Sequence, residues 1–173
     1  MDLVFSKDSA RNATLSLPTG QPVYEISTPS RVWHAEQTTV TKFLPHGGGP
    51  VAIGAVEVHS FHTDVCQISG RNVLPKSDGI FKSGMSFTSS NGEQYTWKRK
   101  SDSALLSNKW NTNIAVYEAM HTGILSGSPQ SAKLSVMPEV MGILDEVVAT
   151  FVYTEQMFQI SRRSSASGAA VAA

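Results

Sequence analysis

The sequence predicts a mainly β fold, either a barrel or a sandwich, completed by one largely buried helix near the C-terminus. Three observations indicate this fold. Short segments with alternating side chains recur along most of the chain, turn-forming residues separate them, and the period becomes helical only after Pro138. Many short strands at this spacing are typical of all-β barrels and sandwiches. The 173 residues suffice for a single domain with a sizeable core.

The expected strands are separated by Gly, Pro, Ser and Asn, the residues that most favour turns. Apolar and β-branched residues fill the segments between these turns, as a pleated, half-buried surface requires. In chain order the strands are expected at Leu3–Ser6, Ala13–Leu17, Pro22–Thr28, Arg31–Ala35, Thr38–Leu44, Val51–Phe61, Val65–Ser69, Arg71–Leu74, Met85–Ser89, Gln94–Lys100, Ser103–Ser107, Asn113–Ala119 and Ala132–Val136.

The segment around Asn91–Gly92 shows the clearest hairpin pattern. This dipeptide suits a type I′ turn, which needs a positive φ at both central positions. After the turn, aromatic and polar side chains alternate, with Tyr95 and Trp97 on one face and Lys98 and Lys100 on the other. We expect the aromatic face to pack inward and both lysines to project together into solvent.

The segment from Pro138 to Arg163 breaks the strand pattern. Apolar residues recur there at helical spacing around much of the circumference, which predicts a largely buried helix. Pro138 suits the first helical turn, Glu139 suits the positive end, and Arg162 with Arg163 suits the negative end. The tail Ser164–Ala173 is small and polar, so we expect one domain over residues 1–163 followed by a disordered tail.

Charge and cysteine content exclude several classes of protein. The chain has 14 Lys and Arg residues and 14 Asp and Glu residues, so it lacks the excess of positive charge that is typical of a general nucleic-acid binder. Cys66 is the only cysteine, which excludes an intrachain disulfide and a Cys-rich zinc module. The N-terminus has no secretory pattern, and Asp145, Glu146 and Glu155 interrupt the longest apolar stretch. We therefore expect a cytoplasmic protein without a transmembrane segment.

Four segments carry a resemblance to known proteins: Gly54–Phe61, Gly84–Thr88, Tyr95–Lys98 and Leu144–Glu155. Through them, the chain resembles tubby-like and LURP-one-like β-barrels and, more narrowly, an uncharacterised family of small proteins from mushroom-forming fungi. The resemblance implies a closed or nearly closed antiparallel barrel of about twelve strands around a central C-terminal helix. The wider superfamily includes phosphoinositide-binding and phospholipid-associated members, which implies lipid binding by analogy.

A local excess of positive charge marks the leading candidate site. The stretch from Arg71 to Lys109 contains seven basic and three acidic residues, an excess of four positive charges. From this stretch we select Lys98, Lys100, Arg71 and Lys82 as candidate ligands for anionic lipid headgroups, because each basic residue near such a surface contributes about 1 kcal/mol. The alternative is an ordinary solvated hairpin with surface lysines.

The segment from His59 to Cys66 holds the densest group of potential metal ligands. Zinc needs three or four converging ligands, and no second cluster accompanies His59, His62 and Cys66, so structural histidines are favoured over a metal site. Cys66 with a histidine base would be a candidate nucleophile. Its apolar strand favours a small buried core residue instead.

These patterns together predict a binding or scaffold module without catalytic residues or a cofactor. Its expected partner is an anionic phospholipid or another protein, not nucleic acid. An enzyme that binds a small molecule in a barrel-mouth pocket near His59, His62 and Cys66 stays open as the alternative.

Overall fold

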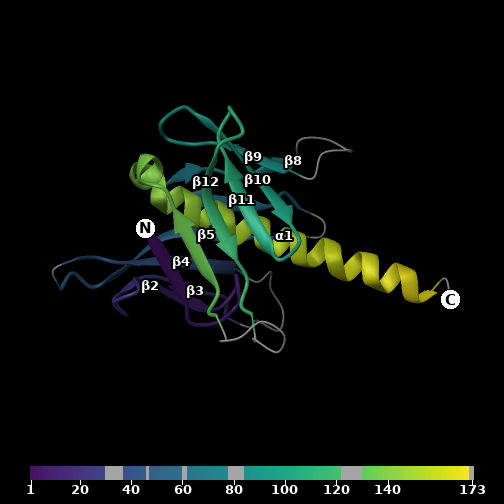
Figure 1. Cartoon of the computed structure of the whole chain (residues 1–173), viewed down its shortest axis with the longest axis horizontal. Coiled ribbons are helices and arrows are strands. Elements are labelled where there is room, and N and C mark those ends of the chain that lie inside the picture. Colours follow the sequence, from purple (N-terminus) through teal and green to yellow (C-terminus); the bar gives the residue numbers. More distant parts are fainter. Residues whose placement is uncertain (30–36, 46, 60–61, 78–83, 122–129, 172–173) are drawn as a thin grey trace.

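The structure is a computed structural model that describes residues 1–29, 37–45, 47–59, 62–77, 84–121 and 130–171, with side chains described as far as residue 164. The strand expected at Arg31–Ala35 lies outside these residues. Within the described part, thirteen strands form one antiparallel sheet, followed by a 3-10 helix and one α-helix (Figure 1). The predicted mainly β class is therefore confirmed.

Neighbouring strands in the sequence are also neighbours in the sheet, except at one junction. β1 to β7 follow one another in order, β8 to β13 do the same, and β1 pairs with β13 to join the two halves. The strands are β1 (Asp2–Phe5), β2 (Ala13–Ser16), β3 (Pro22–Ser27), β4 (Gln37–Phe43), β5 (Pro50–Glu57), β6 (Val65–Ile68), β7 (Arg71–Asn72), β8 (Lys76–Ser77), β9 (Gly84–Thr88), β10 (Gln94–Lys100), β11 (Ser103–Ser107), β12 (Asn113–Glu118) and β13 (Lys133–Val136).

The sheet curls around the helix but is not closed by hydrogen bonds between strands. Its two edges are β7 and β8, which follow one another in the chain and do not pair in the described residues. Both edge strands have two residues, and Pro75 between them has no N–H to donate to a ladder. The closed barrel expected from the sequence is therefore not confirmed.

The predicted C-terminal helix begins as a 3-10 helix and is longer than expected. The 3-10 helix η1 (Pro138–Ile143) precedes the α-helix α1 (Leu144–Val171). Gly142 is a poor helix former at the end of this segment, which is consistent with the irregular first turns, whereas Pro138 occupies the first helical position that proline favours. The segment expected to be a disordered tail is helical as far as Val171, because small residues such as alanine extend an existing helix at little cost.

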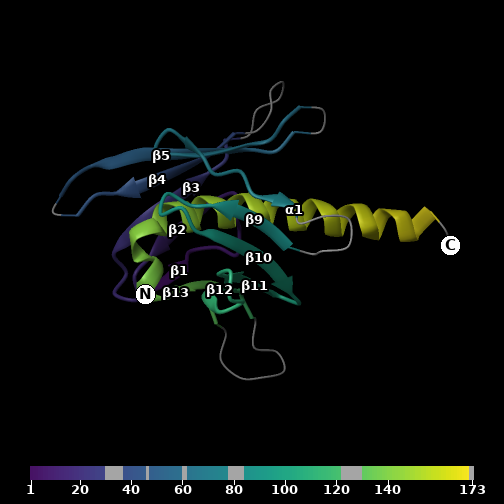
Figure 2. The same ribbon diagram turned by 90° about the horizontal axis from the view of Figure 1, so that it is seen from above.

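The first half of α1 lies between the two halves of the sheet, and its second half projects beyond them (Figure 2). Phe151 is 1% exposed and lies at the centre of an aromatic cluster. Its ring centroid is 4.5 Å from that of Tyr117 and 5.7 Å from those of Phe5 and Trp97. The Trp97 indole N–H also donates to the Thr150 hydroxyl at 3.1 Å, so sheet and helix are joined by both packing and a hydrogen bond.

The β9–β10 turn differs from the predicted type I′ turn. Of its residues, only Gly92 has a positive φ, of 80°. The Gly92 N–H donates to the Ser89 carbonyl and the Ser89 N–H donates to the Glu93 carbonyl, both at 3.0 Å. This is the three-residue loop with a glycine bulge, so the type I′ prediction is wrong here. Two consecutive positive φ angles, 49° and 79°, occur instead at Ser69–Gly70.

Candidate functional site

Three lysines lie on the outer face of β8–β10. Lys76 pairs in register with Ser86, and Ser86 pairs with Thr96, whose hydroxyl lies 2.7 Å from the Ser86 hydroxyl. Directly opposed residues share a face of the sheet, and so do alternate residues along β10. Lys76 therefore lies on the same face as Lys98 and Lys100, and all three side chains are exposed. We call these three residues the basic face.

The β11–β12 turn presents an exposed tryptophan beside the basic face. The Trp110 side chain is 70% exposed, and the Lys109 ammonium lies 4.5 Å from its ring centroid. Lys98 donates to the Asn111 side-chain oxygen at 3.3 Å, which connects the turn to β10. Lys109 also lies 2.9 Å from a Glu93 carboxylate oxygen, so part of its charge is neutralised.

This turn is held in one shape by its own hydrogen bonds. The Asn108 side-chain oxygen accepts from the N–H groups of Trp110 and Thr112, both at 3.0 Å, and Asn111 adopts a positive φ of 59°. Sequence reasoning missed Trp110 as a site residue. The available signal was a large aromatic side chain inside a polar turn segment between two strands, where burial is not expected.

Of the other two cations selected from the sequence, Arg71 is engaged elsewhere and Lys82 lies outside the described residues. The Arg71 guanidinium donates to the Glu146 carboxylate at 2.9 Å. Glu146 is 6% exposed, and its two oxygens also accept from the Ser90 N–H at 2.9 and 3.1 Å. Arg71 therefore joins the sheet edge to α1, and its charge is balanced by a buried carboxylate.

Two further ion pairs join α1 to the inner face of the sheet. Arg99 donates to Glu155 at 2.7 Å, with side chains 16% and 5% exposed. Lys42 lies 2.8 Å from Asp145, and its amine also lies above the Tyr24 ring. The carboxylates of α1 thus balance cations of the sheet, and Lys98 and Lys100 on the opposite face of β10 are not among them.

His59, His62 and Cys66 do not converge on one point. The His59 and His62 ring centroids are 6.1 Å apart, and His59 Nε2 lies 3.0 Å from a Glu57 carboxylate oxygen. Asp64 accepts from the His59 N–H and from the Tyr153 hydroxyl, both at 2.7 Å. Across the chain segments described by the structure, no group of three or more His, Cys, Asp or Glu side chains could hold a metal ion.

Cys66 is a core residue. Its side chain is buried and its thiol donates to the Ala149 carbonyl of α1 at 3.7 Å. Burial raises the pKa of the Cys66 thiol to about 12, so the reactive thiolate is disfavoured at neutral pH. This environment is that of an inert structural cysteine and does not favour the alternative enzyme with a cysteine nucleophile.

Comparison with known proteins identifies the family and nothing more specific. No curated protein and no solved structure matches the chain. In the part that the structure describes, no helix is both long and apolar enough to cross a membrane. A family model matches residues 8–159, from the β1–β2 connection into the second half of α1. Because this match covers most of the chain, the protein belongs to the family of unknown function DUF6593.

Proposed function

We propose that this protein is a non-catalytic binding module that docks on anionic phospholipid surfaces through the basic face and Trp110. The observation that carries the proposal is the 70% exposed Trp110 ring beside Lys109, in a turn whose Asn111 accepts from Lys98. Tryptophan is favoured at the boundary between headgroups and acyl chains, where its ring is apolar and its N–H stays hydrated. Lysines around it add attraction to anionic headgroups.

The charge arrangement favours a surface ligand over an enclosed one. Lys76, Lys98 and Lys100 project from one outer face of the sheet, so the three charges can meet several headgroups of a membrane together. Each contributes about 1 kcal/mol near an anionic surface. Lys109 contributes less, because Glu93 balances part of its charge. Insertion of the Trp110 ring adds a hydrophobic contribution to the free energy of binding, and this contribution does not depend on salt.

The resemblance to tubby-like and LURP-one-like barrels supports the same proposal. A sheet curled around a C-terminal helix is consistent with the arrangement that this resemblance implies, and phospholipid association occurs among members of that superfamily. We further propose that the protein is fungal and that it is located in the cytoplasm. The membrane leaflet that faces the cytoplasm carries the anionic lipids.

Co-sedimentation with vesicles tests the proposal. The vesicles are phosphatidylcholine alone, or phosphatidylcholine with phosphatidylserine. The wild type should bind only the anionic vesicles, and added salt should weaken binding because the lysines are exposed. In the double variant Lys98→Glu/Lys100→Glu two attractions become two repulsions, so binding should fall at least about tenfold.

Two control variants match the changes in charge and in apolar area. Lys7→Glu/Arg162→Glu makes the same change in net charge at exposed positions outside the basic face and should leave most of the binding intact. Trp110→Ala should weaken binding at all salt concentrations, whereas Met120→Ala, at another exposed apolar side chain, should not. A wild type that does not bind anionic vesicles at low salt would refute the proposal, and a scaffold for a protein partner would replace it.

A further inference from the structure

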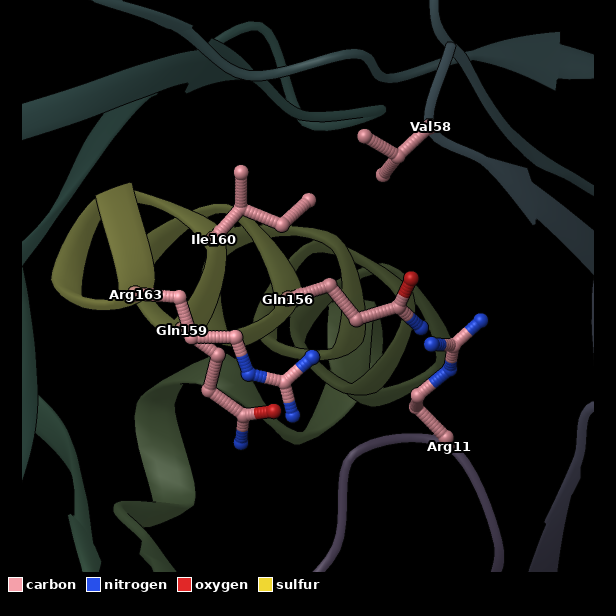
Figure 3. A pocket seen from close by; sticks show the side chains of 6 residues that line it. All are labelled: Arg11, Val58, Gln156, Gln159, Ile160 and Arg163. Atoms are coloured by element: carbon pink, nitrogen blue, oxygen red, sulfur yellow. The ribbon is translucent and has the colours of Figure 1, made fainter. Parts of the chain in front are cut away.

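A pocket lies at the seam of the open sheet, beside its two edge strands, and we call it the seam pocket. Its volume is about 490 Å³, within the roughly 300–1,000 Å³ of pockets that bind small ligands. Asn72–Leu74 line one side, and residues of β8, β9 and the start of β10 line the other. A smaller pocket of about 210 Å³, where α1 leaves the sheet, is lined by Arg11 and Arg163, which already have interactions of their own (Figure 3). The seam pocket is therefore the stronger candidate for a ligand.

The seam pocket opens on the basic face. In the β9–β10 ladder Thr88 pairs with Gln94, and two residues along, Ser86 pairs with Thr96. Residues two apart along a strand share a face of the sheet, so Thr88 and Gln94 lie on the same face as Lys76, which pairs with Ser86. Lys76, Thr88 and Gln94 all line the pocket and are all exposed. A ligand that reaches the basic face from outside can thus enter the pocket.

The pocket combines a buried apolar floor with a polar rim. The side chains of Val73 and Phe87 are 2% and 3% exposed, so the floor belongs to the folded core. Side chains fixed in the core lose little conformational entropy when a ligand binds, which makes this part of the pocket preorganised. Ser77, Thr88 and Gln94 supply neutral hydroxyl and amide groups at the exposed rim. The pocket therefore suits a ligand with a small carbon skeleton and several hydrogen-bonding groups.

Lys76 gives the pocket a positive charge that is available to a ligand. It is the single cation among the lining residues that the structure describes, and none of these residues is acidic. The carboxylate of Glu93, next to Gln94 in the chain, is paired with Lys109 at 2.9 Å. In the described part of the chain, the Lys76 ammonium has neither an ion pair nor a hydrogen bond. The charge of the pocket is therefore not cancelled by the protein itself.

We propose that the seam pocket binds the phosphodiester of a hydroxyl-bearing alcohol, with the phosphate at Lys76 and the alcohol among Ser77, Thr88 and Gln94. A phosphodiester carries a single negative charge, which one lysine balances, whereas a phosphate monoester carries about −1.5 to −2 near pH 7. Lysine binds phosphate as a point charge, whereas planar carboxylates are matched better by the paired donors of arginine. Such a diester joins the headgroup of a phospholipid to its glycerol. For a lipid ligand, the inference rests on the proposed membrane docking and names the headgroup class that the docked protein selects.

Calorimetric titration of the full chain with glycerophosphoglycerol tests the pocket without a membrane. The wild type should bind this probe saturably. Dimethyl phosphate has the same charge but no hydroxyl groups, so it should bind at least about tenfold more weakly. Lys76→Gln removes the charge-assisted contact and should weaken binding of glycerophosphoglycerol at least about tenfold. Lys100→Gln is the matched control, because Lys100 lies on the same face outside the lining, and it should change the affinity by less than about twofold at physiological ionic strength.

A variant that keeps the net charge tests the shape of the pocket. Thr88→Tyr places an aromatic side chain, which strands favour, at an exposed position where it fills the pocket. It should unfold in urea like the wild type and bind glycerophosphoglycerol at least about tenfold more weakly. If this variant does not fold, the pair Lys76→Gln and Lys100→Gln decides the test. The proposal is overturned if the wild type does not bind the probe, if Lys100→Gln loses as much affinity as Lys76→Gln, or if folded Thr88→Tyr binds like the wild type.

Vesicles identify the source of the diester and separate the pocket from membrane docking. On phosphatidylcholine vesicles that contain phosphatidylglycerol, Lys76→Gln and Lys100→Gln lose the same charge, so a greater loss of binding in Lys76→Gln assigns the headgroup to the pocket. Equal losses, together with weaker binding of the soluble probe in Lys76→Gln alone, assign the pocket to a soluble diester. A wild type that binds the probe but no anionic vesicles contradicts membrane docking and supports the pocket. A wild type that binds anionic vesicles but not the probe overturns the pocket and supports docking.

Discussion

Replacing Phe151 by alanine should lower the free energy of unfolding by about 4 kcal/mol. The Phe151 ring is 1% exposed, and three aromatic rings from the sheet surround it with centroids at 4.5 to 5.7 Å. Large-to-small substitution of a buried Phe costs about 3–5 kcal/mol, because the protein loses the contacts of the ring and is also destabilised by the cavity that remains. The three partners belong to hydrogen-bonded strands that hold them away from that cavity, so we expect a cost in the middle of this range and not below it. Urea unfolding followed by far-UV circular dichroism gives the difference from the midpoint and slope.

Two further variants make the measurement specific to the centre of the fold. Phe158→Ala applies the same substitution seven residues later on α1, where the side chain is only partly buried, and should cost about 1–2 kcal/mol. Phe151→Leu keeps most of the volume and should cost less than about 2 kcal/mol. If Phe151→Ala costs no more than Phe158→Ala, the reasoning that α1 forms the centre of the core is refuted.

Two other predictions concern a buried ion pair and a buried thiol. Glu155→Gln leaves the Arg99 charge largely buried without its carboxylate and should cost about 3–5 kcal/mol, whereas Glu93→Gln at the exposed pair with Lys109 should cost less than about 1 kcal/mol. Similar urea midpoints for the two variants would contradict this. For Cys66, the folded protein keeps a proton that the unfolded chain releases above about pH 9, because the pKa of the folded thiol is about 12. The free energy of unfolding should therefore fall as pH rises from about 9 towards 12, with a slope approaching 1.4 kcal/mol per pH unit from this group. Cys66→Ala should be less sensitive to pH between about 9 and 12, and an unchanged slope would show that the thiol contributes nothing.

Local patterns in the sequence predict much of the sheet. Alternation along β10 predicts that Tyr95 and Trp97 face inward and that Lys98 and Lys100 face solvent, and the structure confirms all four positions. Alternation works here because successive side chains of a strand point to opposite faces of the sheet. One buried aromatic residue therefore determines on which face each of its neighbours lies.

Contacts between distant segments could not be predicted in this way. Arg71 and Glu146 are 75 residues apart, and Arg99 and Glu155 are 56 apart. The local pattern shows a charge on a strand but not the carboxylate that a helix later brings to it. For this reason the sequence predicts a surface cation at Arg71, whereas the structure shows that Arg71 anchors α1 through Glu146.

The turn at Asn91 shows a different limit of sequence reasoning. The dipeptide Asn91–Gly92 is compatible with a two-residue and with a three-residue loop, because both accept glycine at a positive φ. The choice depends on contacts outside the turn. Ser90 donates its N–H to the buried Glu146 carboxylate of α1, which favours the loop that presents this N–H to the helix.

The pairing of β1 with β13 determines when this protein can finish folding. Leu3 pairs with Leu134, while every other paired strand in the described sheet meets a neighbour in the sequence. During synthesis, the first strand therefore leaves the ribosome long before its partner exists, and its open edge is available to other chains. The apolar inner face of the sheet also stays uncovered until α1 is made, because α1 follows all the strands in the described chain. Newly made chains should thus depend on chaperones until the C-terminal helix has emerged.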